Sequence, residues 1–124
     1  MSQQPQPEPI GFLLAQVCRL RHARTHELLS ELDLYRGQHS ILRALWKQDG
    51  LTHTELSRHA HVRRSTTTTT LQRMEKTGLV DRKHDAEDQR ISRVYLTERG
   101  RALQDDVEQT WRQLDEETFA GFNL

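Results

Sequence analysis

A run of hydroxyl side chains stands out in the middle of the chain, where Ser65 is followed by five threonines in succession. Threonine is a mediocre helix former and loses several tenths of a kcal/mol against alanine, so helix stability alone does not account for the run. If the run is helical, Leu71 and Met74 define its inward side, and Thr67 and Thr70 share that side. The opposite side then carries Ser65, Thr69, Gln72 and Lys76, flanked by Thr68 and Arg73.

This outward face has the chemistry needed to read the major groove of DNA. Hydroxyls can contact phosphates and base edges, threonine methyls can contact the thymine methyl, and Gln72 and Arg73 suit adenine and guanine. Arg63 and Arg64 stand just before the expected helix, where their guanidinium groups can reach phosphates. The alternative is a low-complexity face that contacts only solvent. The candidate DNA-binding residues are Arg63, Arg64, Ser65, Thr66, Thr68, Thr69, Gln72, Arg73 and Arg90.

Arg90 lies in a polar turn between two short segments that read as strands. Residues 79–83 and 91–96 carry β-branched and aromatic side chains and are predicted to pair as a hairpin, or wing. An arginine at a wing tip can probe the minor groove, where the narrow width concentrates negative potential. Asp88 is predicted to support the wing; in the alternative, Arg90 only pairs with Asp88 to hold the turn, and both roles can coexist. Further charge around the hairpin comes from Arg82, Lys83 and Arg93.

Capping signals show which elements position these groups. Thr52 and Glu55 form a capping box that opens one helix, and this helix breaks near His61. The next helix begins at about Ser65 and stops at Gly78, a residue that readily adopts a left-handed backbone. Two short helices joined this tightly indicate a helix-turn-helix.

Longer amphipathic helices flank this motif. Apolar residues recur at helical spacing over residues 10–32 and again over residues 38–48. Thr97 is predicted to cap a last long helix, whose apolar stripe must be covered by a partner. That stripe consists of Leu103, Val107, Trp111 and Leu114. The predicted fold class is mainly α with a small β-hairpin, a winged helix-turn-helix with N- and C-terminal dimerisation helices.

The expected organisation has four segments. They are a disordered N-terminal arm over residues 1–9, an N-terminal dimerisation helix over residues 10–33, a winged helix-turn-helix DNA-binding domain over residues 34–100 and a truncated C-terminal dimerisation helix over residues 101–124. The two outer helices are predicted to build a two-fold dimer, because the first helix offers a matching stripe. That stripe consists of Leu13, Leu14, Val17 and Leu20.

Composition fits a single polar domain. The chain has 124 residues, of which 34% are hydrophobic and 29% charged, so its core must be thin or shared with a second copy. Net charge is zero, yet residues 51–104 carry eleven basic and seven acidic side chains, whereas residues 105–124 carry one and six. The only cysteine is Cys18, and no apolar run approaches a membrane span. We therefore expect a cytoplasmic protein without a membrane partner.

The segments over residues 51–57, 78–82 and 85–100 closely resemble the MarR (multiple antibiotic resistance) regulators. The most specific element is Asp88-x-Arg90 followed by Leu96-Thr97-x-x-Gly100, which is similar to the wing signature of that family. The resemblance spans about residues 34–104. It implies an obligate homodimer, palindromic operators on double-stranded DNA, and repression relieved by a small ligand or an oxidant.

The chain departs from the family at several positions. Relatives commonly have valine and leucine in place of Thr67 and Thr70, and arginine in place of Thr69, so base preference does not transfer. Relatives also tend to continue with one more helix that completes the dimer interface. Phenolic or other aromatic acids are the effectors that the resemblance implies. Arg19, Arg21 and Arg24 are possible carboxylate partners, or else a solvated basic face.

Several residues raise alternatives to DNA binding. Cys18 suggests an oxidant sensor, but a small buried core residue is the simpler interpretation. His22 and His26 form the only histidine pair at helical i, i+4 spacing and lack an evident third ligand, so no metal or other cofactor is expected. The sequence has neither a phosphate-binding glycine loop nor a nucleophile–base pair, so an enzyme is not predicted. The main alternative to DNA binding is a winged-helix protein-interaction module, in which Arg63, Arg64 and Arg90 bind an acidic protein partner.

Overall fold

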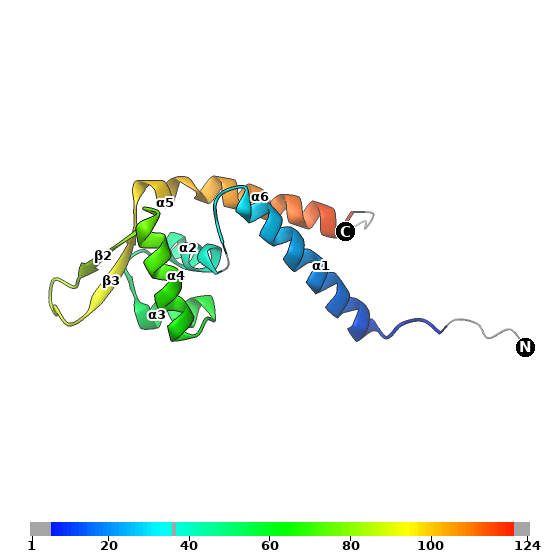
Figure 1. The fold of residues 1–124 in the computed structure, drawn as a ribbon, viewed down its shortest axis with the longest axis horizontal. Helices are drawn as coiled ribbons and strands as arrows, with labels where there is room; N and C mark the ends of the chain where they lie inside the picture. Colours follow the sequence, from blue (N-terminus) through cyan, green and yellow to red (C-terminus); the bar gives the residue numbers. More distant parts are fainter. Residues whose placement is uncertain (1–5, 36, 121–124) are drawn as a thin grey trace, which may run out of the picture.

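The computed structural model describes residues 6–35 and 37–120, which form a compact lobe and a helical arm (Figure 1). Helix α1 spans Ile10–Ser30 and helix α6 spans Gln104–Thr118; together we call them the helical arm. The compact lobe contains four helices: α2 (Gln38–Lys47), α3 (His53–Ala60), α4 (Arg64–Lys76) and α5 (Glu98–Ala102). It also contains three strands: β1 (Leu51–Thr52), β2 (Val80–His84) and β3 (Ser92–Leu96). Part of the N-terminal segment expected to be disordered, residues 1–5, and residues 121–124 of the expected last helix lie outside the described residues.

The predicted fold class is confirmed, and the predicted stops of α3 and α4 have clear local causes. Thr52 caps α3, since its Oγ1 accepts a hydrogen bond from the Glu55 amide at 3.2 Å. His61 ends the same helix with a left-handed backbone at φ 54°, and Gly78 follows α4 at φ 77°. The tight connection between the two helices is therefore fixed by local residues. Arg64 is the first residue of α4 rather than a residue before it, so only Arg63 stands outside as the N-cap.

The hairpin was predicted, but the sheet has a third strand that was not. The order is β1-β3-β2, all antiparallel, and Leu51 pairs with Val94 at the inner edge. A strand of two residues shows no alternation, so the sequence carries no signal for it. Gly50 precedes it at φ 74°, where a Cβ would lie 2.9 Å from the Tyr95 ring, so a larger residue would strain this junction. β1 ties the start of α3 to the wing.

The compact lobe has a continuous apolar core beneath α3 and α4. Leu56, Leu71 and Met74 are fully buried at 0% exposure and join the two helices to the sheet. Thr67 is equally buried and Thr70 nearly so, as predicted from the inward side of α4. The lobe therefore holds α4 by one face and leaves its opposite face exposed.

The last helix differs from its prediction. Thr97 caps only the short α5, through its Oγ1 and the Gly100 amide at 3.1 Å, and the chain passes through Leu103 before α6 begins. Half of the stripe expected to require a partner is covered within the chain, because Val107 and Leu114 are 2% and 1% exposed, while Leu103 and Trp111 are partly buried. The first helix also ends at Ser30 rather than near residue 33.

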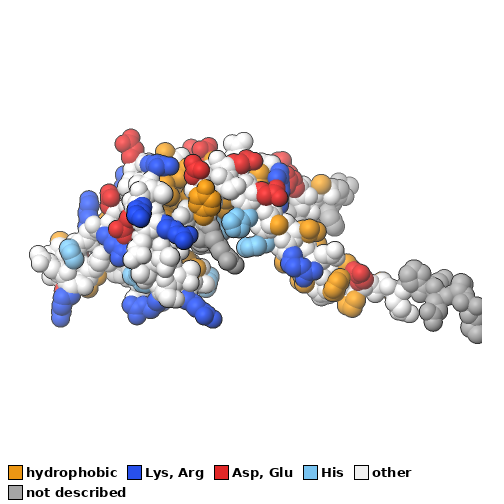
Figure 2. Space-filling view, in the orientation of Figure 1, with side chains coloured by type: hydrophobic (Ala, Val, Ile, Leu, Met, Phe, Trp, Pro, Cys, Tyr) orange, Lys and Arg blue, Asp and Glu red, His pale blue; other side chains and the backbone are white. Residues whose placement is uncertain are grey.

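The exposed apolar surface lies instead on the N-terminal half of α1. Its large side chains are between 43% and 84% exposed, and Figure 2 shows hydrophobic side chains along this projecting helix. They are Ile10, Phe12, Leu13, Leu14, Val17 and Leu20, which we call the α1 stripe. Within the described residues, no helix is both long enough and apolar enough to cross a membrane.

Candidate nucleic-acid interface

Helix α4 presents the predicted hydroxyl face to solvent. Its six candidate side chains that follow Arg64 are all exposed. They are Ser65, Thr66, Thr68, Thr69, Gln72 and Arg73. Thr67 and Thr70 point inward, and the Ser57 hydroxyl donates to Thr67 Oγ1 at 3.0 Å in a buried link between α3 and α4. The angle between these helices is thus held by a polar contact as well as by the core.

The threonine hydroxyls are already used as donors. Thr67, Thr68, Thr69 and Thr70 each donate to the carbonyl oxygen four residues earlier, at 3.1, 3.0, 3.2 and 2.8 Å. A phosphate oxygen can only accept, so Thr68 and Thr69 in this rotamer have no hydrogen to donate to it. What they present outward are oxygen lone pairs and methyl groups. These suit base amino groups and the thymine methyl better than the phosphate backbone.

Arginines at the two ends of α4 contribute positive charge to this face. Arg63, Arg64 and Arg73 are exposed, and none of their guanidinium groups forms an ion pair within residues 6–35 and 37–120. In Figure 2, Lys and Arg side chains gather along the lower edge of the lobe, below α3 and α4, and below the hairpin. Unpaired guanidinium groups at a helix start are suited to phosphates.

His53 is part of this face and was not predicted. Its Nε2 lies 2.9 Å from Thr68 Oγ1, and because that hydroxyl donates to the Arg64 carbonyl, the ring N–H is the donor to Thr68. Burial, followed by the charges of Arg64 and Arg82, lowers the pKa of His53 below its ordinary value. Its place at the start of the helix before α4 is the sequence signal that could have identified it.

The wing tip is held by Asp88. Its Oδ1 accepts from both the amide and the Nε of Arg90 at 3.0 Å, and its Oδ2 accepts from Nη2 at 3.0 Å. These hydrogen bonds, the side-chain ones first, hold the pKa of the Asp88 carboxyl below its usual range. The Arg90 side chain is still 90% exposed, so pairing with Asp88 does not bury it.

The other arginines of the hairpin are committed within the chain. Arg93 donates to the Gly50 carbonyl at 3.0 Å and lies 3.5 Å from Asp85, which fixes the base of the wing to the lobe. Arg82 forms an ion pair with Glu75. The extra hairpin charge predicted from the sequence is therefore mostly structural, and Arg90 is the exposed cation of the tip.

The helical arm pairs two of its arginines with acids of α6. Arg21 Nη2 lies 2.8 Å from Asp115, and Arg24 makes two 3.0 Å hydrogen bonds to Glu117. Charge alone would allow pairing with the acids at the start of α6, but the structure uses acids of its C-terminal half. The acids at the start are Asp105, Asp106 and Glu108.

Cys18 also differs from its prediction. It is exposed on α1 rather than buried in the core, so the packing role predicted for it is wrong. Its thiol lies at the edge of a cavity between α1, α2 and α6, where small molecules in solvent can reach it.

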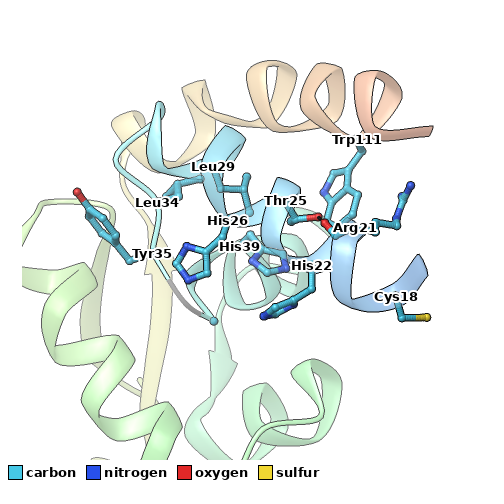
Figure 3. Close-up of a pocket in the computed structure, with 11 residues that line it drawn as sticks. Cys18, Arg21, His22, Thr25, His26, Leu29, Leu34, Tyr35, His39 and Trp111 are labelled. Carbon is cyan, nitrogen blue, oxygen red and sulfur yellow. Dashed lines mark hydrogen bonds between the residues drawn. The ribbon is translucent and has the colours of Figure 1, made fainter. Parts of the chain in front are cut away.

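A cavity of about 280 Å³ opens between α1, α2 and α6 (Figure 3). Its walls include Leu29, Leu34, Tyr35 and Trp111, and three histidines enter it. Among the described residues there is no group of three or more His, Cys, Asp or Glu side chains placed to hold a metal ion.

Comparison with known proteins places these features in a family. A sequence profile described as "MarR family" matches residues 34–92. An HTH-type transcriptional repressor of Mycobacterium tuberculosis is 34% identical over 112 residues, covering 90% of this chain and 81% of the relative. The organic hydroperoxide resistance transcriptional regulator of Bacillus subtilis is 33% identical over 97 residues, covering 73% and 66%.

Solved structures agree with this assignment. The chain superposes on BpsR of Bordetella bronchiseptica, whose DNA binding is regulated by 6-hydroxynicotinic acid, with a TM-score of 0.81 at 25% identity; the match covers 97% of this chain and 87% of that one. It also superposes on the apo form of wild-type MarR from E. coli with a TM-score of 0.80 at 26% identity, covering 95% and 88%. The winged helix-turn-helix of this chain is therefore shared with regulators of known structure.

Proposed function

The chain belongs to the MarR family of transcription regulators, which are not enzymes, and on that premise we propose that it is a repressor that binds palindromic operators as a dimer and is released by a small ligand. The observation that carries the proposal is the exposed face of α4. This face combines unpaired arginines with outward threonines, while the opposite face is locked into the core. A helix that only contacts solvent would gain nothing from a run of threonines that lowers its stability.

Each candidate residue has a proposed role. Arg63 and Arg64 contact phosphates at the start of α4, and Arg90 enters the minor groove from the wing that Asp88 supports. Gln72 and Arg73 pair with base edges in the major groove. The remaining contacts to bases come from the hydroxyl oxygens of Ser65, Thr66, Thr68 and Thr69 and from the methyl groups of these threonines.

The proposed dimer uses the α1 stripe. Exposed apolar side chains that share one face of a projecting helix, such as Leu13, Val17 and Leu20, are stabilised when a second copy covers them. Two-fold pairing places two α4 helices on one face of DNA, about 34 Å apart, and so requires inverted half-sites roughly ten base pairs between centres. In this proposal residues 10–33 and 101–124 serve dimerisation and residues 34–100 bind DNA.

Selection of genomic fragments with the purified protein tests the operator proposal. We expect the recovered duplexes to share an inverted repeat with that spacing, and binding to weaken steeply with salt as phosphate contacts release counterions. Recovered fragments without a common motif, or binding to acidic proteins in place of DNA, would favour the protein-interaction module. Analytical ultracentrifugation that finds a monomer with full affinity for one half-site would refute the dimer.

The cavity between α1, α2 and α6 is the proposed effector site. It adjoins both the helical arm and the compact lobe, so an occupant can favour one spacing of the two. The regulation of BpsR by 6-hydroxynicotinic acid supports an aromatic acid as the ligand class. Calorimetry against a panel of aromatic acids tests this proposal. If none of the acids binds to protein that still binds DNA, the result counts against the effector site.

Oxidant sensing by Cys18 is the second candidate. Its exposure favours access by a peroxide, and one relative is a regulator of organic hydroperoxide resistance. A cumene hydroperoxide titration of the protein–operator complex checks it. Release that persists in Cys18→Ser excludes this cysteine as the sensor.

A further inference from the structure

The cavity between α1, α2 and α6 is lined, among the residues that the structure describes, by several titratable bases and by no acid. Three of its lining residues are histidines, His22 and His26 from α1 and His39 from α2, whose rings lie near one another in Figure 3. The rings of His22 and His26 are 6.3 Å apart, edge to face. Among the described lining residues there is no aspartate or glutamate. A site with several titratable bases and no acid favours an anionic occupant.

The arginine in the same cavity is not available for that occupant. Arg21 donates to the Leu114 carbonyl at 3.1 Å and to Asp115 at 2.8 Å, and its guanidinium lies 5.8 Å from the Trp111 ring centroid. Arg24, the other cation expected to hold a carboxylate, is paired with Glu117 and Glu27 outside the cavity. Both guanidinium groups already have their counterions.

The imidazoles, in contrast, have donors and acceptors to spare. The rings of His22 and His26 make no hydrogen bond within the described part of the chain, and His39 has only Ser40 Oγ, 3.4 Å from its Nε2. Burial lowers the pKa of His39, and the charges of Arg43, His22 and His26 lower it further. His39 is therefore mostly neutral near pH 7 when the cavity is empty.

The other titratable groups facing the histidines do not supply a counter-charge. On α1 these are Cys18 and the paired Arg21, and on α2 there is the cationic Arg43. The preceding loop contributes Tyr35, whereas Asp115 of α6 pairs with Arg21 and does not line the cavity. An anion entering the cavity would be the first unpaired negative charge that the imidazoles meet.

The remaining walls favour a flat apolar body. The Trp111 ring centroid lies 5.8 Å from that of His39, and Leu29, Leu34 and Tyr35 complete the lining. An apolar cavity of about 150 Å³ is enough to bind benzene. The 280 Å³ available here is therefore sufficient for a molecule with one aromatic ring and a carboxylate.

We propose that this cavity binds a one-ring aromatic carboxylate through its histidines rather than its arginines, and takes up a proton from solvent as it does so. The inference deepens the effector site proposed above and rests on it. The carboxylate stabilises the charged imidazolium, so a proton moves from the buffer to a ring nitrogen when the ligand binds. The affinity for the carboxylate must then rise as the pH falls below the pKa that the imidazole has in the occupied cavity. It levels off below the pKa that the imidazole has in the empty cavity.

The site also has a route to the DNA-binding face. Gly37 lines the cavity, and a Cβ added there would lie 3.7 Å from Thr70 Oγ1 on α4. Gly37, just before α2, thus borders the ligand cavity and lies beside the helix proposed to enter the major groove. A charged, filled cavity can shift Gly37 and so change the fit of α4 to DNA.

Calorimetry of the full chain with benzoate, in phosphate and in Tris buffer, tests the proposal. The two buffers differ in ionisation heat, so the difference in observed heat gives the number of protons taken up. We expect net uptake near pH 7.5 and an affinity that rises by up to about tenfold per pH unit from about pH 8 to about pH 6. Benzamide, the uncharged analogue, should bind more weakly and without proton uptake.

Variants identify the groups that titrate. His22→Gln, His26→Gln and His39→Gln, combined, should remove the proton uptake and flatten the pH profile, whereas His59→Gln on α3 should change neither. Histidine ring resonances of the unaltered protein, followed by NMR with and without benzoate, should show raised pKa values for cavity histidines only. This measurement does not depend on the folding of a variant.

Several outcomes would overturn the proposal. They are the absence of benzoate binding, binding without proton uptake, and equal uptake in the triple variant. Operator binding is measured separately without benzoate. If the protein binds benzoate with proton uptake but selects no DNA, the repressor proposal is refuted and the proposal for the cavity stands. If it selects DNA but does not bind benzoate, the proposal for the cavity is refuted and the repressor proposal stands.

Discussion

The compact lobe and the helical arm leave opposite kinds of surface without a partner. In the lobe most apolar side chains are buried, but Arg63, Arg64 and Arg73 have no carboxylate partner among the described residues. In the arm Arg21 and Arg24 are paired with acids of α6, but the α1 stripe is exposed. Arginine thus pairs within the fold in the arm, whereas Arg63, Arg64 and Arg73 of the lobe are free for an outside partner. The lobe is suited to a polyanion, and the arm is suited to an apolar surface.

The largest effect should come from placing a charge on the α1 stripe. Val17→Asp leaves the core intact, because Val17 is 45% exposed, but it places a charge in the proposed dimer interface. We expect a monomer by ultracentrifugation and an operator affinity lower by about a hundredfold or more, since the second half-site no longer adds avidity. Far-UV circular dichroism should be unchanged.

Val107→Asp provides the contrast, because Val107 is 2% exposed within the chain itself. An unpaired buried charge there costs about 3 to 5 kcal/mol and should unfold the protein rather than only dissociate it. If Val17→Asp remained dimeric, or Val107→Asp remained folded, the contrast between a covered α6 stripe and an uncovered α1 stripe would be wrong.

Changes on the outward face of α4 should come next in size. Arg73→Ala is expected to reduce discrimination at one defined base pair by about 1 to 3 kcal/mol, as for other base-edge contacts, and Thr69→Ala should act at a neighbouring position. Competition titrations with single-substitution operators measure this. An equal loss of affinity for every sequence would show that Arg73 contacts only phosphate.

Phosphate and wing contacts should have smaller and sequence-independent effects. Arg64→Ala should weaken specific and non-specific DNA together and reduce the slope of log affinity against log salt by about 1. Arg90→Ala should weaken both in the same way, with little sequence choice beyond groove width. Affinities measured at several salt concentrations decide this. A loss confined to a single operator base pair would reassign either residue to base contact.

A modest pH effect is expected from His53. The pKa of His53 is lowered in the free protein, and a nearby DNA phosphate would raise it, so the complex binds more protons than its parts. DNA affinity should therefore increase severalfold as the pH falls from about 8 to about 6, for any sequence. His53→Gln retains a donor for Thr68 and should remove the pH dependence. A profile that is unchanged in this variant would assign the titration elsewhere.

The smallest effect should come from the arm arginines. Arg24→Ala removes exposed ion pairs to Glu117 and Glu27, and such pairs are screened by water and salt. We expect a small change in thermal stability and no change in the salt slope of DNA binding, in contrast to Arg64→Ala. A reduced salt slope in Arg24→Ala would mean that the arm also contacts DNA.

The sequence by itself determined the local elements and the outward face of α4. The capping box at Thr52, the stop at Gly78 and the inward position of Thr67 and Thr70 follow from backbone preferences and a 3.6-residue period, which act over one or two turns. The pairing of Arg90 with its aspartate was also predictable, because the two residues are only two apart in one turn.

Only the tertiary structure decided which surfaces are covered and which charges are paired. Periodicity marks the apolar side of a helix but not what lies against it, so it assigned the α6 stripe to a partner when Val107 and Leu114 are buried in the same chain. For the same reason it could not show that the arginines of α1 pair with Asp115 and Glu117, more than 90 residues away. The histidine cavity likewise arises from helices that are distant in sequence, and the contacts that form it depend on how those helices pack.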